Sequence, residues 1–211
     1  GTQQDEYTEP DVTSMAAVYA IPMSATYRGP WAEGENYFAG GPGEELSQVS
    51  HNGVRWQCLS THVSDTSNAP GYKSAKWIPV EGDLEPHVTF AEDSITVVKG
   101  HIDETLTAIV TMYGEDISTD STVSYKWTRR SWSLQTVGTG SGPSAAAKFV
   151  ERVSLDTLWN QKNHTGRTLH FTDADMDWLA NGGPDKLQFT VEATINEPGK
   201  TAKKVRAIAE F

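Results

Sequence analysis

The sequence predicts an all-β protein with two domains, a small aromatic-rich β domain followed by a β-sandwich. Turn residues are frequent, with 18 Gly and 10 Pro in 211 residues. Helical periodicity is nearly absent, and several short segments alternate apolar with polar residues. An acidic segment with Gly and Pro at residues 80–86 separates the aromatic part from the long alternating segments, so we place the domain boundary there.

The chain divides into three predicted parts. We expect residues 1–23 to be an N-terminal arm or linker, because their apolar residues show no period. Residues 24–82 are expected to form the small domain, and residues 83–211 the sandwich. Because no Met precedes Gly1, we expect the chain to be a fragment of a longer protein.

The small domain is expected to depend on aromatic side chains for its core. A domain of this size buries little surface, and each aromatic ring buries about 150–250 Å². Its aromatic residues are Tyr27, Trp31, Tyr37, Phe38, Trp56, Tyr72 and Trp77. Between two short β-type segments, Asn52-Gly53 predicts a tight hairpin.

Eight strands are predicted for the sandwich from short, evenly spaced alternating segments. They cover residues 88–91, 94–98, 105–113, 122–130, 145–153, 167–172, 186–195 and 203–211. Alternation places Trp127 and Phe189 in the core. Short helices are predicted at residues 154–160, with Ser154 as cap, and 172–178, where Thr172 and Asp175 have capping-box spacing.

The motifs of the small domain carry a family resemblance. They run from Tyr27-Arg28-Gly29-Pro30-Trp31 through the Asn52-Gly53 hairpin and Asn68-Ala69-Pro70-Gly71 to a closing Trp77. This order resembles the small chitin- and cellulose-binding modules of bacterial chitinases, and more closely the version of that module in phage and prophage tail proteins. The resemblance implies a carbohydrate-binding-module-like fold over residues 27–80.

The same resemblance implies four candidate carbohydrate-binding residues, Trp31, Tyr37, Trp56 and Trp77. Sugar-binding members place an exposed aromatic pair directly after the second hairpin strand, whereas residues 58–62 read Cys-Leu-Ser-Thr-His here. We therefore favour a core position for the three tryptophans over a ligand platform, and we predict weak or no binding to chitin or cellulose.

The sandwich resembles an immunoglobulin-like domain. Trp127 lies on a middle strand, Phe189 on a late strand, and the last strand ends at Phe211. This resemblance implies a fold and no function.

Charge and composition exclude several classes of function. The formal net charge is −11, from 17 Lys+Arg and 28 Asp+Glu, which argues against nucleic acid or an anionic membrane as partner. The longest apolar run, about residues 16–21, is too short for insertion into a membrane. The single cysteine, Cys58, excludes an internal disulfide and is expected to be a buried, inert thiol.

No motif predicts a catalytic residue, a metal site or a cofactor. Asp173, Asp175 and Asp177 have the spacing of a calcium loop, but Trp178 and Pro184 replace its Gly and Glu. The six histidines lack metal-ligand spacing, and residues 138–143 form neither a nucleophile elbow nor a phosphate loop.

One cluster of cations stands out at the end of a predicted strand. It comprises Lys126, Arg129 and Arg130 together with Trp132. A charged strand end is the favoured interpretation, and contact with an acidic partner or glycan is the alternative.

Taken with these exclusions, the resemblance implies a non-enzymatic structural or host-surface-binding part of a phage or prophage tail protein. Its expected partners are other tail proteins or copies of itself, with a cell-surface glycan as a further candidate. The expected location of the protein is the virion tail or the extracellular space. We expect a prophage in a bacterial genome to encode it. The alternatives are a carbohydrate-binding accessory region of a secreted glycoside hydrolase and a bacterial surface adhesin.

Overall fold

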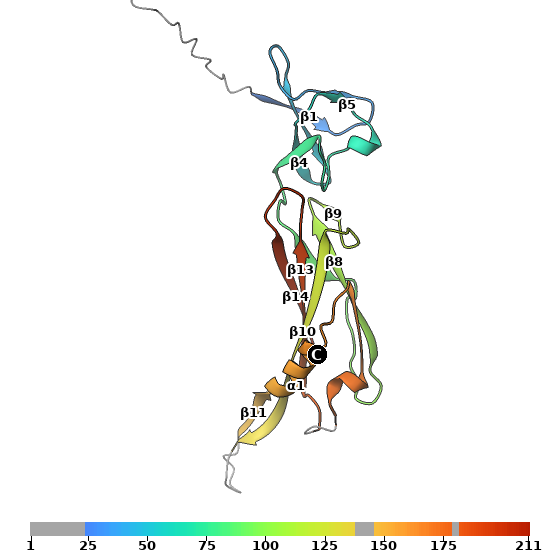
Figure 1. Cartoon of the computed structure of the whole chain (residues 1–211), viewed down its shortest axis with the longest axis vertical. Coiled ribbons are helices and arrows are strands. Elements are labelled where there is room, and N and C mark those ends of the chain that lie inside the picture. Colours follow the sequence, from blue (N-terminus) through green and yellow to red (C-terminus); the bar gives the residue numbers. More distant parts are fainter. Residues whose placement is uncertain (1–23, 138–145, 179–181) are drawn as a thin grey trace, which may run out of the picture.

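The computed structural model describes residues 24–137, 146–178 and 182–211. The arm predicted for residues 1–23 and the loop at residues 138–143 lie outside the described residues. Figure 1 shows two β-rich units stacked end to end, an N-terminal unit (residues 25–81) and a sandwich (residues 87–210). The predicted all-β fold class is confirmed.

The N-terminal unit is built on one four-stranded sheet in the order β1-β3-β4-β6. Strand β1 pairs with β3 in parallel, and the other neighbours are antiparallel. A two-stranded sheet, β2-β5, and a short 3₁₀ helix complete the unit. The elements are β1 (Ala25–Pro30), β2 (Asn36–Tyr37), β3 (Leu46–His51), β4 (Val54–Cys58), β5 (His62–Val63), η1 (Thr66–Asn68) and β6 (Trp77–Glu81).

The predicted hairpin joins β3 to β4. His51 pairs with Val54, which leaves Asn52 and Gly53 as the two turn residues. Both have positive φ, 49° and 76°, as a type I′ turn requires. The hairpin prediction is therefore confirmed.

The sandwich consists of two sheets with the strand orders β12-β8-β7 and β11-β10-β13-β14. The short strand β9 pairs with β8 off this path. Its elements are β7 (His87–Phe90), β8 (Asp103–Met112), β9 (Glu115–Asp116), β10 (Val123–Val137), β11 (Ala146–Glu151), α1 (Val153–Gln161), β12 (Thr168–Thr172), η2 (Asp173–Met176), β13 (Lys186–Ile195) and β14 (Lys203–Glu210).

The strand orders are those of an immunoglobulin-like sandwich. In that fold one sheet holds the first, second and fifth strands, and the other holds the third and the last two. Here β7, β8 and β12 form the first sheet, while β10, β13 and β14 form the second. Trp127 on β10 and Phe189 on β13 are 1% and 0% exposed, so their predicted core positions are confirmed.

Three local predictions were wrong or incomplete. No strand forms at residues 94–98, although Ile95 and Val97 pack against the core. Strand β10 continues to Val137, beyond the predicted end at residue 130. Helix α1 begins after Arg152, which makes no side-chain cap, so Ser154 is not the cap.

The second predicted helix is a 3₁₀ helix, η2. Its capping box is present as predicted, because Thr172 caps the start and the Asp175 carboxylate accepts the Thr172 amide at 3.0 Å. Asp177 follows in the left-handed conformation and ends it.

The two units meet at a packed junction. The rings of Trp56 and Tyr113 lie edge to face with centroids 5.4 Å apart. Lys73 forms an ion pair with Asp120 at 2.6 Å across the same junction. Gly114 has φ +74°, and a Cβ at this position would lie 2.1 Å from the Asn52 carbonyl oxygen, so the close approach of the units requires glycine here.

Candidate functional site

Three of the four aromatic residues predicted as carbohydrate ligands lie in the core of the N-terminal unit. Tyr37, Trp56 and Trp77 are 2%, 1% and 2% exposed. The rings of Tyr37 and Trp77 pack edge to face with centroids 5.1 Å apart. Protein atoms therefore cover the ring faces that would stack on a sugar.

The alternation of strand β4 explains these positions. Val54, Trp56 and Cys58 point inward and are buried, and the Trp56 indole N–H donates to the His51 carbonyl at 3.2 Å. Trp31 is only partly buried and packs edge to face with His51 at 5.4 Å. The core positions predicted for Trp56 and Trp77 are confirmed, and Trp31 lies at the margin of that core.

The opposite side of the same sheet carries a polar surface with an aromatic ring. We call this surface the outer face. Strand pairing sets Tyr27 beside Gln48, Gln48 beside Gln57, and Ser50 beside Arg55. The outer face comprises Tyr27 from β1, Gln48 and Ser50 from β3, Arg55 and Gln57 from β4, and Glu81 from β6.

Tyr27 is the exposed aromatic ring of this face. Its side chain is 51% exposed. Its hydroxyl donates to Ser50 Oγ at 3.0 Å, and the Arg55 guanidinium carbon lies 5.0 Å from its ring centroid. These two contacts hold the ring in one orientation over the sheet.

Hydrogen-bonding groups surround the ring. Arg55 forms an ion pair with Glu81 at 2.8 Å, and the Gln48 amide donates to Gln57 at 3.2 Å. All four side chains keep further donor or acceptor capacity toward solvent. A sugar presents an apolar C–H face and a rim of hydroxyl groups. An exposed aromatic ring can stack on the C–H face, and the neighbouring guanidinium, carboxylate and amide groups can form hydrogen bonds with the hydroxyl groups.

Residues 30–78 match the sequence model of carbohydrate-binding module family 5/12. The matched segment includes all four predicted aromatic residues and four of the six outer-face residues, whereas Tyr27 and Glu81 lie outside it. The chain thus contains a carbohydrate-binding-module-like domain, the N-terminal unit, called the module below. Comparisons with curated proteins and with solved structures find no match.

Residues 58–62 of the module provide no exposed aromatic ring. Cys58 is buried, and desolvation raises the pKa of its thiol. Leu59 is 51% exposed, whereas His62 packs edge to face on Trp77 at 5.4 Å. The outer face was missed in the sequence because Tyr27 was assigned to the core with the other aromatic residues; the alternation of β3 and β4 was the available signal.

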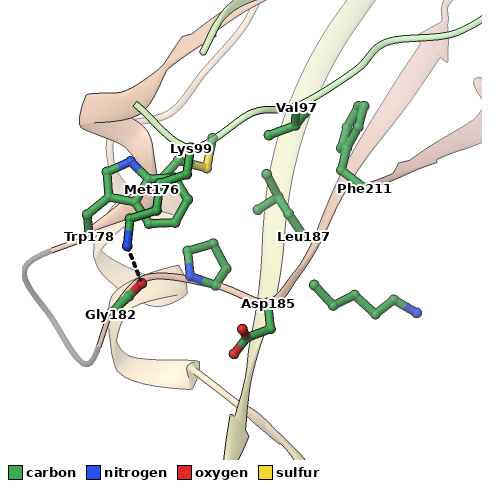
Figure 2. A pocket seen from close by; sticks show the side chains of 10 residues that line it. Val97, Lys99, Met176, Trp178, Gly182, Asp185, Leu187 and Phe211 are labelled. Atoms are coloured by element: carbon green, nitrogen blue, oxygen red, sulfur yellow. Dashed lines mark hydrogen bonds between the residues drawn. The ribbon is translucent and has the colours of Figure 1, made fainter. Parts of the chain in front are cut away.

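A separate pocket of about 310 Å³ lies in the sandwich, beside η2 and the start of β13. Figure 2 shows Lys99 and Trp178 at one side of it and Leu187 and Phe211 at the other. The Lys99 ammonium nitrogen lies 4.9 Å from the centroid of the Trp178 ring and 3.5 Å from the Gly182 carbonyl oxygen. The ammonium is thus held at the wall of this pocket.

The cation cluster predicted at a strand end is divided between two environments. Arg130 is exposed and pairs with Glu151 at 2.7 Å. Arg129 is 1% exposed and forms ion pairs with Asp156 at 2.8 Å and Asp177 at 2.9 Å. The surface interpretation was therefore wrong for Arg129, since alternation along β10 turns it inward.

The aspartates with calcium-loop spacing have separate protein partners. Asp173 accepts the amides of Gly100 and Ile102, at 2.8 and 3.0 Å. Asp175 closes the capping box, and Asp177 pairs with Arg129. Over residues 24–137, 146–178 and 182–211 there is no group of three His, Cys, Asp or Glu side chains that could hold a metal ion. No helix within these ranges has the length and apolar character to cross a membrane.

Proposed function

We propose that this chain is a non-enzymatic, glycan-contacting part of a phage or prophage tail protein that works outside the cell at the host-facing end of the virion. The match of residues 30–78 to a carbohydrate-binding module family is the observation that supports glycan contact. The tail assignment rests on the motif order from Tyr27-Arg28-Gly29-Pro30-Trp31 to Trp77. Other tail proteins or copies of this chain are the proposed structural partners.

The outer face is the proposed contact surface. Tyr27 offers one ring to one pyranose, while Arg55, Glu81 and the two glutamines bond its hydroxyl groups. Binding to insoluble chitin or cellulose is expected to be weak, because one ring does not form the row of platforms that follows a long polysaccharide.

The second candidate is a carbohydrate-binding accessory region of a secreted glycoside hydrolase or a bacterial surface adhesin. The family match supports this candidate equally well. The full-length reading frame and its neighbouring genes distinguish the two: tail-assembly neighbours favour the first, and a hydrolase domain on the same chain favours the second.

Replacement of Tyr27 tests the proposed surface. Retention of the chain on a panel of bacterial cell-wall glycans and on insoluble chitin is measured for wild type, Tyr27→Ala and Tyr27→Phe. We expect Tyr27→Ala to weaken binding to the retained glycan by about tenfold or more, and Tyr27→Phe to keep most of it because the ring remains.

The control is Val63→Ala, which shortens a side chain that is 59% exposed and lies on β5, away from the outer face. Equal binding by Tyr27→Ala and Val63→Ala would contradict the assignment of the outer face. Strong retention on chitin that survives high salt would contradict the single-ring argument.

A further inference from the structure

A cavity of about 220 Å³ lies at the junction of the module and the sandwich. Side chains of both units line it, so neither unit forms it alone. It is separate from the outer face, whose six residues do not line it.

The module supplies an apolar wall. Leu59 and Ile78 form its accessible part, because the rings of Trp56 and Trp77, which also border the cavity, are only 1% and 2% exposed. Leu59 and Ile78 are 51% and 41% exposed, so the wall continues to the surface. Apolar side chains that stay exposed beside a cavity are typical of a binding site.

The sandwich supplies a polar end. Glu197 is 9% exposed and accepts the Tyr113 hydroxyl at 3.2 Å and the Lys200 ammonium at 2.7 Å. Lys200 also donates to the Tyr113 oxygen at 3.2 Å. An ammonium has three N–H groups and a carboxylate about four acceptor positions, so both keep capacity toward the cavity.

We propose that this junction cavity binds one pyranose residue of a neutral glycan. The exposed side chains of Leu59 and Ile78 fit the C–H face of the sugar ring, and the Glu197–Lys200 pair offers an acceptor and a donor to two neighbouring hydroxyl groups. A neutral ligand is favoured over an acidic one, because Glu197 and Asp120 already neutralise Lys200 and Lys73, the two lysines that line the cavity. The inference rests on the proposed function only in taking the ligand to be a glycan.

The test is a nuclear magnetic resonance titration of the indole N–H signals of Trp56 and Trp77. Each indole N–H has a fixed backbone partner, the carbonyls of His51 and Asn68, so a change in either signal reports a change at its ring. The probes are the methyl glycosides of glucose, galactose and N-acetylglucosamine at millimolar concentrations. We expect both signals to shift with at least one probe, in wild type and in Tyr27→Ala alike.

Leu59→Arg is the blocking variant, because a long charged side chain at this exposed position fills the mouth of the cavity without entering the core. We expect it to abolish the shifts. Val63→Arg makes the same change at another exposed position of the module and should leave them unchanged. Glu197→Gln should weaken the interaction by about tenfold, because it replaces a charged acceptor by a neutral one.

Unmoved indole signals with all three probes, or equal shifts in Leu59→Arg and Val63→Arg, would overturn the junction site. The outer face is judged separately. If Tyr27→Ala loses all glycan binding and Leu59→Arg loses none, only the outer face is a glycan site. If Leu59→Arg loses all binding and Tyr27→Ala loses none, only the junction cavity is a glycan site.

Discussion

Arg129 shows how a single residue can organise one end of the sandwich. Its guanidinium is buried and has three partners: Asp156 on α1, the Asp175 carbonyl on η2, and Asp177, the residue that ends η2. Asp156 in turn accepts the backbone amide of Ser131 at 2.7 Å and its hydroxyl at 2.8 Å. The pair therefore ties α1 and η2 to strand β10.

Removal of one member of this buried pair should be costly. We expect Asp156→Ala to lower the free energy of unfolding by about 3–5 kcal/mol, because it removes the buried carboxylate partner of Arg129 and leaves only the more exposed Asp177 to pair with that charge. Urea-induced unfolding followed by tryptophan fluorescence provides the measurement. Arg130→Ala breaks the exposed pair with Glu151 and should cost less than about 1 kcal/mol. Similar losses of unfolding free energy in Asp156→Ala and Arg130→Ala would mean that burial of the Arg129 pair does not increase its contribution to stability.

Strand β10 is the element on which the sandwich core depends. It pairs with β13 along ten residues, and its inward positions include Tyr125 and Trp127. The Trp127 ring stacks on Phe90 at 6.1 Å, and its indole N–H donates to the Gly166 carbonyl at 2.9 Å. One side chain of β10 thus contacts both sheets of the sandwich or their connections.

Truncation of the Trp127 side chain tests how far the stability of the sandwich depends on strand β10. We expect Trp127→Ala to lower the free energy of unfolding by about 3–5 kcal/mol, which is comparable to the whole stability of a small domain. Lys126→Ala, on the neighbouring outward position, should change it by no more than about 0.5 kcal/mol. Limited proteolysis of Trp127→Ala then shows whether residues 27–80 resist digestion after the sandwich unfolds; simultaneous digestion of both units would mean that they fold as one.

Strands were predictable from sequence wherever a segment that alternates apolar with polar residues also pairs through its backbone with a neighbouring strand. The strand predicted at residues 186–195 is β13, and all its inward side chains are buried. Residues 94–98 show the limit: Ile95 and Val97 alternate because they pack inward, yet no neighbouring strand pairs with their backbone. Alternation reports burial on one side, whereas a strand also needs a hydrogen-bonding neighbour.

The candidate site was harder to predict than the fold. Its aromatic residues were identifiable from sequence, but which of them are exposed depends on strand register and on packing between distant segments. Tyr27 and Arg55 come together only because β1 pairs in parallel with β3, and nothing local in the sequence indicates that pairing. The junction cavity depends in the same way on contacts between units far apart in the chain.

At the scale of the whole molecule, charged contacts across the junction make its stability sensitive to acid. Asp120 accepts hydrogen bonds from the Lys73 ammonium and from Thr122, and these bonds lower the pKa of its carboxyl to about 2. A carboxyl whose pKa is lower in the folded state than in the unfolded state stabilises the fold above its unfolded pKa. That contribution is lost as the pH falls from about 4 toward 2.

We therefore expect the free energy of unfolding of wild type to fall more steeply between pH 4 and pH 2 than that of Asp120→Asn. Denaturant titrations at several pH values provide the comparison. Asp93→Asn, which changes an exposed aspartate away from the junction, should follow the wild-type curve. Parallel curves for wild type and Asp120→Asn would show that the Lys73–Asp120 pair contributes nothing in this range.

The close approach of Gly114 to Asn52 bears on the assembly of copies proposed above. A joint packed this tightly limits the angle between module and sandwich, so copies held side by side would present their outer faces in one direction. In the proposed assembly, a weak single contact would gain from effective concentration, because after one copy has bound, the next would already be oriented toward its sugar. Avidity of this kind depends on spacing: the array would favour surfaces whose glycans recur at the distance between copies and gain nothing from those whose glycans do not.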